Sequence, residues 1–384
     1  MDPVARYREF RSVRFFGSLD GLRALSIMGV VWFHCWWGTP YYSKLLATPI
    51  LRQGEYGVHI FFVISGFLIT TLLLREQDKF GKISLRDFYI RRALRIWPLY
   101  YATIAVYILV VLLFERGTSR AYSFFHYLPA FLTYTYTWFL SANWPPGIFN
   151  LAWTLCTEEQ FYAFWPLPLR ALGGRWSAAL MVGLIALRTA TGYGWLQSVL
   201  PPGWLPTRIV LSLAVPICLG ALLAQVLHSS KGFCFLYAIL GHKSTAPAAL
   251  VALALCLVPT RVPLWWAWTA TVALVGACVV REDSGLSALL RFRPMAFIGT
   301  VSYGMYLLNS LSVHFVHSLL DRIGLQHPVL VFPIGLGVNL GAAFLSYRYF
   351  EKPFLALKSR FSRLNTTEGK PSICGSASPE SVVS

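Results

Sequence analysis

Two ionisable side chains lie inside one strongly apolar stretch of this chain. The segment LDGLRALSIMGVVWFHCWW, residues 19–37, contains Arg23 and His34. On a helix, eleven residues return to within roughly 20° of the starting face and rise about 16 Å, so both side chains share one stripe. Ionisable groups inside membrane segments usually face a cavity or a partner and mark function. We therefore predict that both belong to one active site. The alternative is that Arg23 reaches the lipid headgroups and His34 supports a helix contact.

A pair of carboxylates occupies a second apolar stretch, LAWTLCTEEQFYAFWP, residues 151–166. An ionised carboxylate in a membrane helix is costly, so at least one of Glu158 and Glu159 should be paired or protonated. Counted from the start of its helix, Glu158 is expected in the same half of the membrane as His34. A carboxylate beside a neutral imidazole would fix its tautomer and stabilise the imidazolium formed on proton abstraction. The alternative is a structural pair with an Arg or Tyr of another helix.

Arginines cluster where the third apolar stretch begins, in FYIRRALRIWPLYY. Arg92 and Arg95 are three residues apart and share a helix face. Two guanidinium groups on one face, beside the first turn of a helix, could bind phosphates. The alternative is that these arginines only anchor the helix at the cytoplasmic surface.

Two further stretches carry polar groups at helical spacing. In GVHIFFVISGFLIT, residues 57–70, Ser65 could contact a substrate, or the Ser-Gly pair could serve only close helix packing. In VSYGMYLLNS, residues 301–310, a stripe of Tyr303, Tyr306 and Asn309 could line a cavity.

The composition identifies the class of protein that must position these groups. Of 384 residues, 56% are apolar and 13% charged, about half the charged fraction of a soluble domain. The apolar runs are continuous rather than alternating, which predicts membrane-spanning helices and not strands. The net charge of +17 would suggest nucleic acid in a soluble protein, but here it follows the positive-inside rule. We therefore expect no nucleic-acid partner.

The fold class we predict is an all-α polytopic membrane protein with about ten spans and both termini in the cytoplasm. Of the 33 Lys and Arg residues, 24 fall in the segments that this topology places in the cytoplasm and 8 in the outer segments. Residues 122–140 are predicted to form a short or re-entrant element. The predicted parts are a basic segment at 1–18, a membrane domain at 19–355 and a disordered cytoplasmic tail at 356–384. The predicted spans are 19–38, 57–75, 95–114, 150–170, 177–193, 208–227, 247–260, 264–281, 296–318 and 329–350.

Taken together, these segments resemble the acyltransferase-3 family of bacterial integral-membrane O-acyltransferases. LDGLRALSIMGVVWFH matches the family's Arg-x10-His, GVHIFFVISGFLI its Phe-Phe-x-x-Ser-Gly segment and FYIRRALRIWPLYY its Arg-x-x-Arg. WTLCTEEQFYAFWP is similar to the segment that carries the family's glutamate, here Glu158, followed by Tyr162. VSYGMYLL and SYRYFEKPF match the closing segments. One departure is Asn309, where family members often have His.

The resemblance implies transfer of an acyl group from a coenzyme A thioester, with acetyl-CoA the expected donor, to a hydroxyl of a carbohydrate or a glycosylated small molecule. His34 and Glu158 would be catalytic, and Ser65 and Tyr162 would bind substrate. The candidate coenzyme A ligands are Arg23, Arg92 and Arg95. His34 would act as a general base or carry the acyl group covalently. No metal is expected, the location would be the bacterial inner membrane in contact with lipid, and the oligomeric state stays open. The rival interpretation is a secondary transporter of an organic anion or saccharide.

Overall fold

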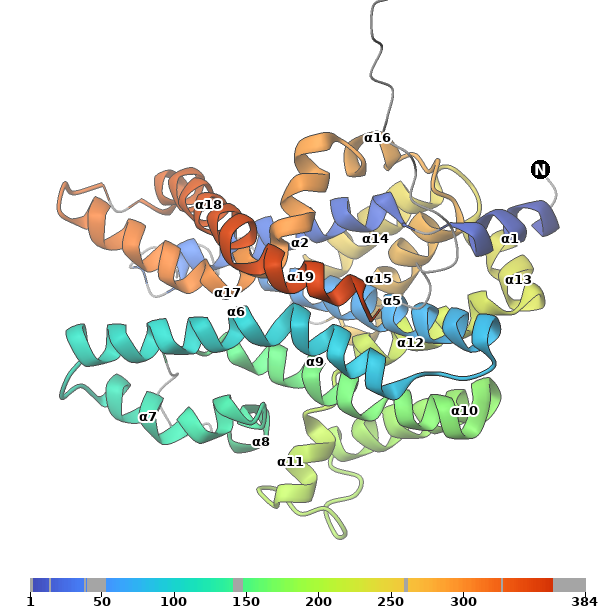
Figure 1. The fold of residues 1–384 in the computed structure, drawn as a ribbon, viewed down its shortest axis with the longest axis horizontal. Coiled ribbons are helices and arrows are strands. Elements are labelled where there is room, and N and C mark those ends of the chain that lie inside the picture. Colours follow the sequence, from blue (N-terminus) through green and yellow to red (C-terminus); the bar gives the residue numbers. More distant parts are fainter. Residues whose placement is uncertain are drawn as a thin grey trace, which may run out of the picture.

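The computed structural model describes residues 3–13, 15–37, 39, 53–140, 148–258, 262–325 and 327–361. Within these ranges the chain forms helices and no strand, as the continuous apolar runs predicted (Figure 1). The N-terminal half contains α1 (Pro3–Ser12), α2 (Gly17–Trp36), η1 (Gln53–Tyr56), α5 (Gly57–Phe80), α6 (Leu85–Phe114), α7 (Ser119–Leu132), α8 (Tyr136–Phe139), α9 (Ala152–Phe164) and α10 (Pro166–Gly192).

The C-terminal half is also helical and ends on a helix outside the predicted spans. Its elements are α11 (Leu205–Leu211), α12 (Val215–His228), α13 (Ser230–Leu240), α14 (Thr245–Leu257), α15 (Leu264–Val280), α16 (Ser287–Leu290), α17 (Arg293–Asp321), α18 (Pro328–Leu345), the π-helical turn η2 (Ser346–Glu351) and α19 (Lys352–Ser359). α19 passes the domain boundary predicted at 355. The rest of the predicted tail, 362–384, lies outside the described residues.

Several helices are long and apolar enough to cross a membrane. Three qualify singly, and up to six if each of three bent helix pairs counts as one span. The ten spans and the orientation of the termini are therefore not confirmed. The structure divides residues 122–140 between α7 and α8, of which the longer has 14 residues, so this stretch forms the short elements expected from the sequence.

Helices α2 and α5 run through the centre of the molecule and contact each other closely. A Cβ on Gly57 would overlap the carbonyl oxygen of Ser26, so the two backbones approach where Gly57 lies level with Ser26. At the other end of this contact, the ring of Phe16 packs edge-on against Phe67, with centroids 5.5 Å apart. The two helices therefore run in opposite directions, because residue numbers fall along α2 as they rise along α5.

Other helices enclose this central pair. α17 packs against α2, and α12 packs against α5. α6 and α9 lie side by side along the remaining face, and α19 lies next to α6 (Figure 1). The chain segments that hold Arg23 and Tyr303 therefore converge on the centre of the bundle, although these residues are 280 positions apart in the sequence.

Candidate active site

A cavity of about 300 Å³ lies between α2, α5, α6, α9 and α17. It follows α5 from Val58 to Arg75, which at 1.5 Å per residue is a length of about 26 Å. A space this long and this small in volume is narrow, and it suits a linear group better than a globular one. Six of the residues predicted from the sequence line it: Arg23, Ser65, Arg92, Arg95, Glu158 and Tyr162.

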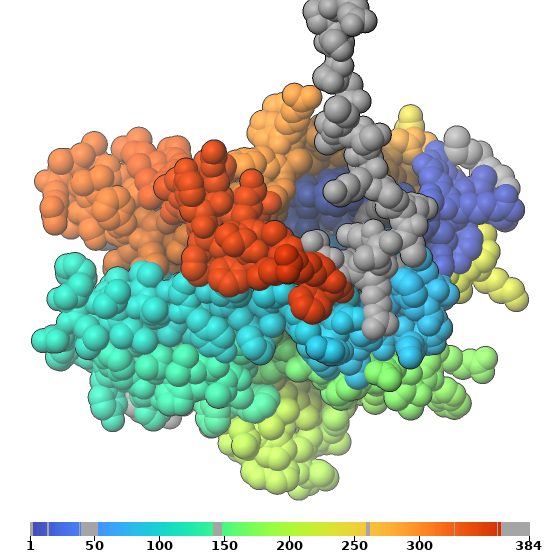
Figure 2. Space-filling view, in the orientation of Figure 1, coloured from blue at the N-terminus to red at the C-terminus, as the bar shows by residue number. Residues whose placement is uncertain are grey.

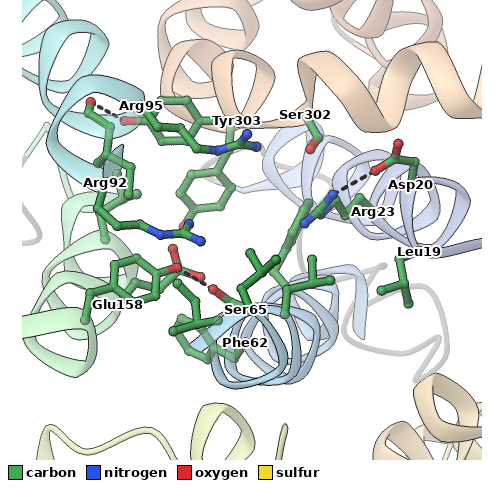
Figure 3. Close-up of a pocket in the computed structure, with 18 of the residues that line it drawn as sticks. Leu19, Asp20, Arg23, Phe62, Ser65, Arg92, Arg95, Glu158, Ser302 and Tyr303 are labelled. Atoms are coloured by element: carbon green, nitrogen blue, oxygen red, sulfur yellow. Dashed lines mark hydrogen bonds and ion pairs between the residues drawn. The ribbon is translucent and has the colours of Figure 1, made fainter. Parts of the chain in front are cut away.

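The α6 arginines enter the cavity from one side, as their shared helix face predicted (Figure 3). The proposed help from a helix N-terminus is wrong, because α6 begins at Leu85, seven residues before Arg92. The neighbouring Arg91 points elsewhere: it donates to the Glu76 carboxylate at 3.0 Å and to the carbonyl oxygen of Phe361 at 2.7 Å. Arg92 and Arg95 thus face the cavity, whereas Arg91 links α6 to α5 and to the C-terminal end of the described chain.

Glu158 lies at the centre of a polar group supplied by three helices. The Tyr162 hydroxyl, one turn along α9, interacts with the Glu158 carboxylate, and Arg92 and Arg23 are the cations that act on it. The guanidinium of Arg92 lies over the Tyr162 ring, 5.2 Å from its centroid. The negative charge of Glu158 therefore offsets part of the positive charge of Arg23 and Arg92.

Ser65 and Gly66 divide the two roles that the sequence left open. The Ser65 hydroxyl is hydrogen-bonded to the Tyr162 hydroxyl and lines the cavity. Gly66 lies on the other side of α5, where a Cβ would overlap the carbonyl oxygen of Ile217 in α12. Adjacent residues on one helix point in different directions, so Ser65 faces the cavity while Gly66 permits close packing.

Arg23 reaches the cavity from the side opposite to Arg92 and Arg95 (Figure 3). Its Nη1 donates to Asp20 Oδ1 at 2.7 Å, one turn earlier on α2. This ion pair orients the guanidinium toward the cavity centre and provides the compensation that a buried charge needs. The alternative interpretation, in which Arg23 only reaches the lipid headgroups, does not describe this arrangement.

Cations dominate the cavity. Its lining carries five of them (Arg23, Arg75, Arg92, Arg95 and Lys358) against two carboxylates, Asp20 and Glu158. Arg75 and Lys358 were not identified as site residues from the sequence. Arg75 is partly engaged, since it donates to the backbone carbonyl oxygens of Phe10 and Val13. Arg95 and Lys358 have no hydrogen bond or ion pair within the described ranges. An excess of cations in an enclosed space fits an anionic ligand.

His34 does not line this cavity. Gly57 marks the end of the cavity near Val58 and lies level with Ser26, eight residues and about 12 Å before His34 along α2. The expectation that Glu158 orients His34 is therefore not met: the imidazole Nδ1 instead lies 2.8 Å from the carbonyl oxygen of Val30. The estimate of depth failed because it measured α9 from its start, without the packing that places Glu158 beside Ser65.

The hydrogen bond to Val30 nevertheless defines the chemistry of His34. A carbonyl oxygen only accepts, so the proton of a neutral ring must be on Nδ1 and donated to Val30. Nε2 then carries the free lone pair. His34 is thus held in the tautomer that a general base needs, by the backbone of its own helix and not by a carboxylate.

The α17 stripe contributes two of its three predicted residues to the cavity. Tyr303 donates to the carbonyl oxygen of Ile96 at 2.7 Å, and Tyr306 is hydrogen-bonded to Thr154 at 2.7 Å. Both line the cavity, whereas Asn309 does not. Asn309 is fully buried, so its side chain belongs to the core of the bundle and not to the cavity wall.

Known proteins match this chain along most of its length. A Bacillus subtilis protein provisionally named as a peptidoglycan O-acetyltransferase, YrhL, is 30% identical over 90% of this chain and 56% of its own length. The peptidoglycan O-acetyltransferase OatA of Listeria monocytogenes is 29% identical over 80% of this chain and 50% of its own length. A provisionally named O-acetyltransferase of Staphylococcus aureus is 27% identical over 92% and 59%.

The chain spans about half to three fifths of the length of these relatives. No solved structure matches it. Residues 16–348 match the family described as an acyltransferase domain, and this range contains every helix that lines the cavity except α19. The matched range and the apolar helices together make the chain a membrane protein of the acyltransferase-3 family.

Proposed function

We propose that this chain is an acyl-CoA-dependent O-acyltransferase that moves an acetyl group to a hydroxyl of a cell-wall glycan. Family membership supports an acyltransferase, and the names of the relatives supply the acetyl group and the glycan class. None of the three comparisons supports the transporter alternative. The glycan and the donor are our inference for this chain.

The narrow cationic cavity carries this proposal. Coenzyme A joins a nucleotide with several phosphate charges to a thin, linear pantetheine arm that ends in the thioester. Its phosphates would bind Arg92 and Arg95 by charge-assisted hydrogen bonds, with Arg23 opposite them. A volume of about 300 Å³ is at the lower limit of ligand pockets, so the cavity would hold the acyl-pantetheine arm alone. The nucleotide would stay at the end of the cavity that Arg92 and Arg95 line, which we call the cationic end.

The chemistry is a single acyl transfer. Nε2 of His34 would remove the proton of the acceptor hydroxyl, whose oxygen then attacks the thioester carbonyl carbon. The carbon–sulfur bond breaks, and the coenzyme A thiolate leaves and takes up a proton. In a covalent variant, His34 Nε2 would accept the acyl group first and pass it to the hydroxyl. Both routes require the free lone pair that the Val30 hydrogen bond leaves on Nε2.

In this scheme Glu158 acts on the donor side. Its carboxylate lies among Arg23, Arg92 and Tyr162, where it would hold the two guanidinium groups apart and keep them oriented in the empty cavity. The hydroxyl groups of Ser65 and Tyr162 are hydrogen-bonded to each other, and these two residues would contact the acyl-pantetheine arm. The thioester must pass the layer of Ile27 and Val30, both buried, to reach His34.

The direct test uses the purified protein in detergent, without any membrane gradient. Acetyl-CoA should be consumed with release of free thiol when a peptidoglycan fragment is present, and the fragment should gain one acetyl group by mass spectrometry. The Arg92→Met, Arg95→Met double variant should lose acetyl-CoA binding, whereas Arg86→Met, an exposed arginine of the same helix, should not. Absence of thioester cleavage and of coenzyme A binding by the wild-type protein would refute the proposal.

A further inference from the structure

The C-terminal helix α19 supplies a side chain to the cavity. Lys358, in the last turn of α19, lines the same space as Arg23, Arg92 and Arg95. It lies ten residues beyond the end of the family match at 348. We propose that Lys358 is a phosphate-binding residue of the donor site, an inference that rests on the proposed function and extends the site to a part of the chain outside the matched region.

The position of α19 places Lys358 at the cationic end of the cavity. After the π-helical turn η2, α19 runs along α6, and its atoms lie against those of α6 on the molecular surface (Figure 2). Lys358 is half-buried, whereas Lys352 at the start of the same helix is exposed. The helix therefore directs Lys358 toward the cavity, beside the α6 arginines, and leaves Lys352 exposed on the surface.

Hydrogen bonds fix the end of α19 next to the cavity. The carbonyl oxygen of Phe361, three residues after Lys358, accepts from Arg91 Nη1 at 2.7 Å. Arg91 Nη2 is held 3.0 Å from the Glu76 carboxylate, which is only 2% exposed and also accepts from the backbone N–H of Ser84 at 2.8 Å. Arg91 of α6, held by Glu76 of α5, thus fixes the backbone that follows Lys358, so the position of Lys358 is built into the fold.

The charges around Lys358 point to an anion as its partner. Arg91, Arg92, Arg95 and Arg23 all act on its ammonium group, and within the described residues no carboxylate forms an ion pair with it. Like charges in an enclosed site repel each other and cost stability unless a ligand neutralises them. A lysine ammonium is a compact charge that binds a phosphate oxygen from any direction, which complements the planar guanidinium groups.

The test compares acetyl-CoA with S-acetylpantetheine, which keeps the acyl-pantetheine arm but lacks the phosphates and the adenosine. Lys358→Met should raise the Kd for acetyl-CoA roughly ten- to a hundredfold, the loss expected for one charge-assisted contact. The KM for S-acetylpantetheine, which has no phosphate, should stay at the wild-type value. Lys358→Arg should keep most of the acetyl-CoA affinity, and the control Lys352→Met should behave as wild type. Melting temperatures in detergent verify that each variant is folded.

The outcomes separate the two proposals. If the wild-type protein binds acetyl-CoA and Lys358→Met binds it equally well, Lys358 has no role in the donor site, although the proposed function stands. If Lys358→Met weakens both donors to the same extent, the side chain supports the fold and the phosphate contact is refuted. If the wild-type protein binds neither acetyl-CoA nor free coenzyme A, the proposed function itself fails, and the Lys358 inference fails with it.

Discussion

The two ends of α2 carry ionisable residues on one face, but the surrounding helices leave a cavity beside Arg23 that His34 does not line. Around Arg23, four other helices and α19 leave a narrow space lined by cations, and Asp20 orients the guanidinium. His34 lies beyond the end of the cavity, and among the described residues its imidazole is hydrogen-bonded to the backbone of its own helix alone. The cavity that we propose for the donor is thus open in the structure, whereas the buried side chains of Ile27 and Val30 lie between it and the proposed base.

This contrast separates what a helix pattern determines from what packing determines. The eleven-residue spacing places Arg23 and His34 on one stripe, because that follows from helix geometry alone. Whether a cavity extends along the whole stripe depends on which helices face it. Ile27 and Val30, between the two residues, are buried in the core, so the stripe is filled at its middle.

The largest expected effect tests the base. His34→Ala should reduce acetyl transfer to the glycan by about two to four orders of magnitude, the usual contribution of a positioned general base. Its Kd for acetyl-CoA should remain unchanged, because His34 lies about 12 Å along α2 beyond the cavity. Rapid-mix assays of transfer, together with calorimetric binding, measure both quantities. Transfer near the wild-type rate in a folded variant would remove His34 from the chemistry.

The opposite pattern should follow from a change at the cationic end. Arg92→Met should raise the Kd for acetyl-CoA roughly ten- to a hundredfold, since a charge-assisted phosphate contact is lost. At saturating donor, the transfer rate should stay within a few-fold of wild type. If Arg92→Met and His34→Ala instead changed the same kinetic constant, the two ends would not have the separate roles that we propose for them.

Sequence reasoning succeeded where one helix decides the outcome. It predicted a helical membrane protein and the shared face of Arg92 and Arg95, and it selected six residues that prove to line one cavity. It failed for the Glu158–His34 pair, which required the relative heights of α2 and α9. It also missed Lys358, because only the π-helical turn and the Arg91 clamp bring the end of α19 back to the cavity.

A change at Glu158 distinguishes two arrangements, one with Glu158 beside the cavity cations and the other with Glu158 beside His34. The two predict different changes in the Kd for coenzyme A. In the structure the Glu158 carboxylate lies near Arg23 and Arg92, the cations that we propose to bind phosphate, so Glu158→Gln should lower the Kd for coenzyme A by a few-fold. Were Glu158 the partner of His34, as the sequence suggested, the same change would reduce transfer and leave coenzyme A binding unaltered. Glu159→Gln removes a carboxylate that acts on Arg92 from outside the cavity wall, so it should lower this Kd by a smaller factor. Titration calorimetry of the three proteins measures the difference.

The smallest expected effects divide the neighbours Ser65 and Gly66. Gly66→Ala places a methyl group against the backbone of Ile217 in α12 and should destabilise the protein by roughly 1–3 kcal/mol, as overpacking does. Ser65→Ala should leave the melting temperature in detergent unchanged but raise the KM for S-acetylpantetheine several-fold, because the Tyr162 hydroxyl loses its partner beside the acyl arm. If Ser65→Ala lowered the melting temperature as much as Gly66→Ala and left KM unaltered, the hydroxyl pair would belong to the helix packing, and the cavity wall at α5 would have no part in binding the donor.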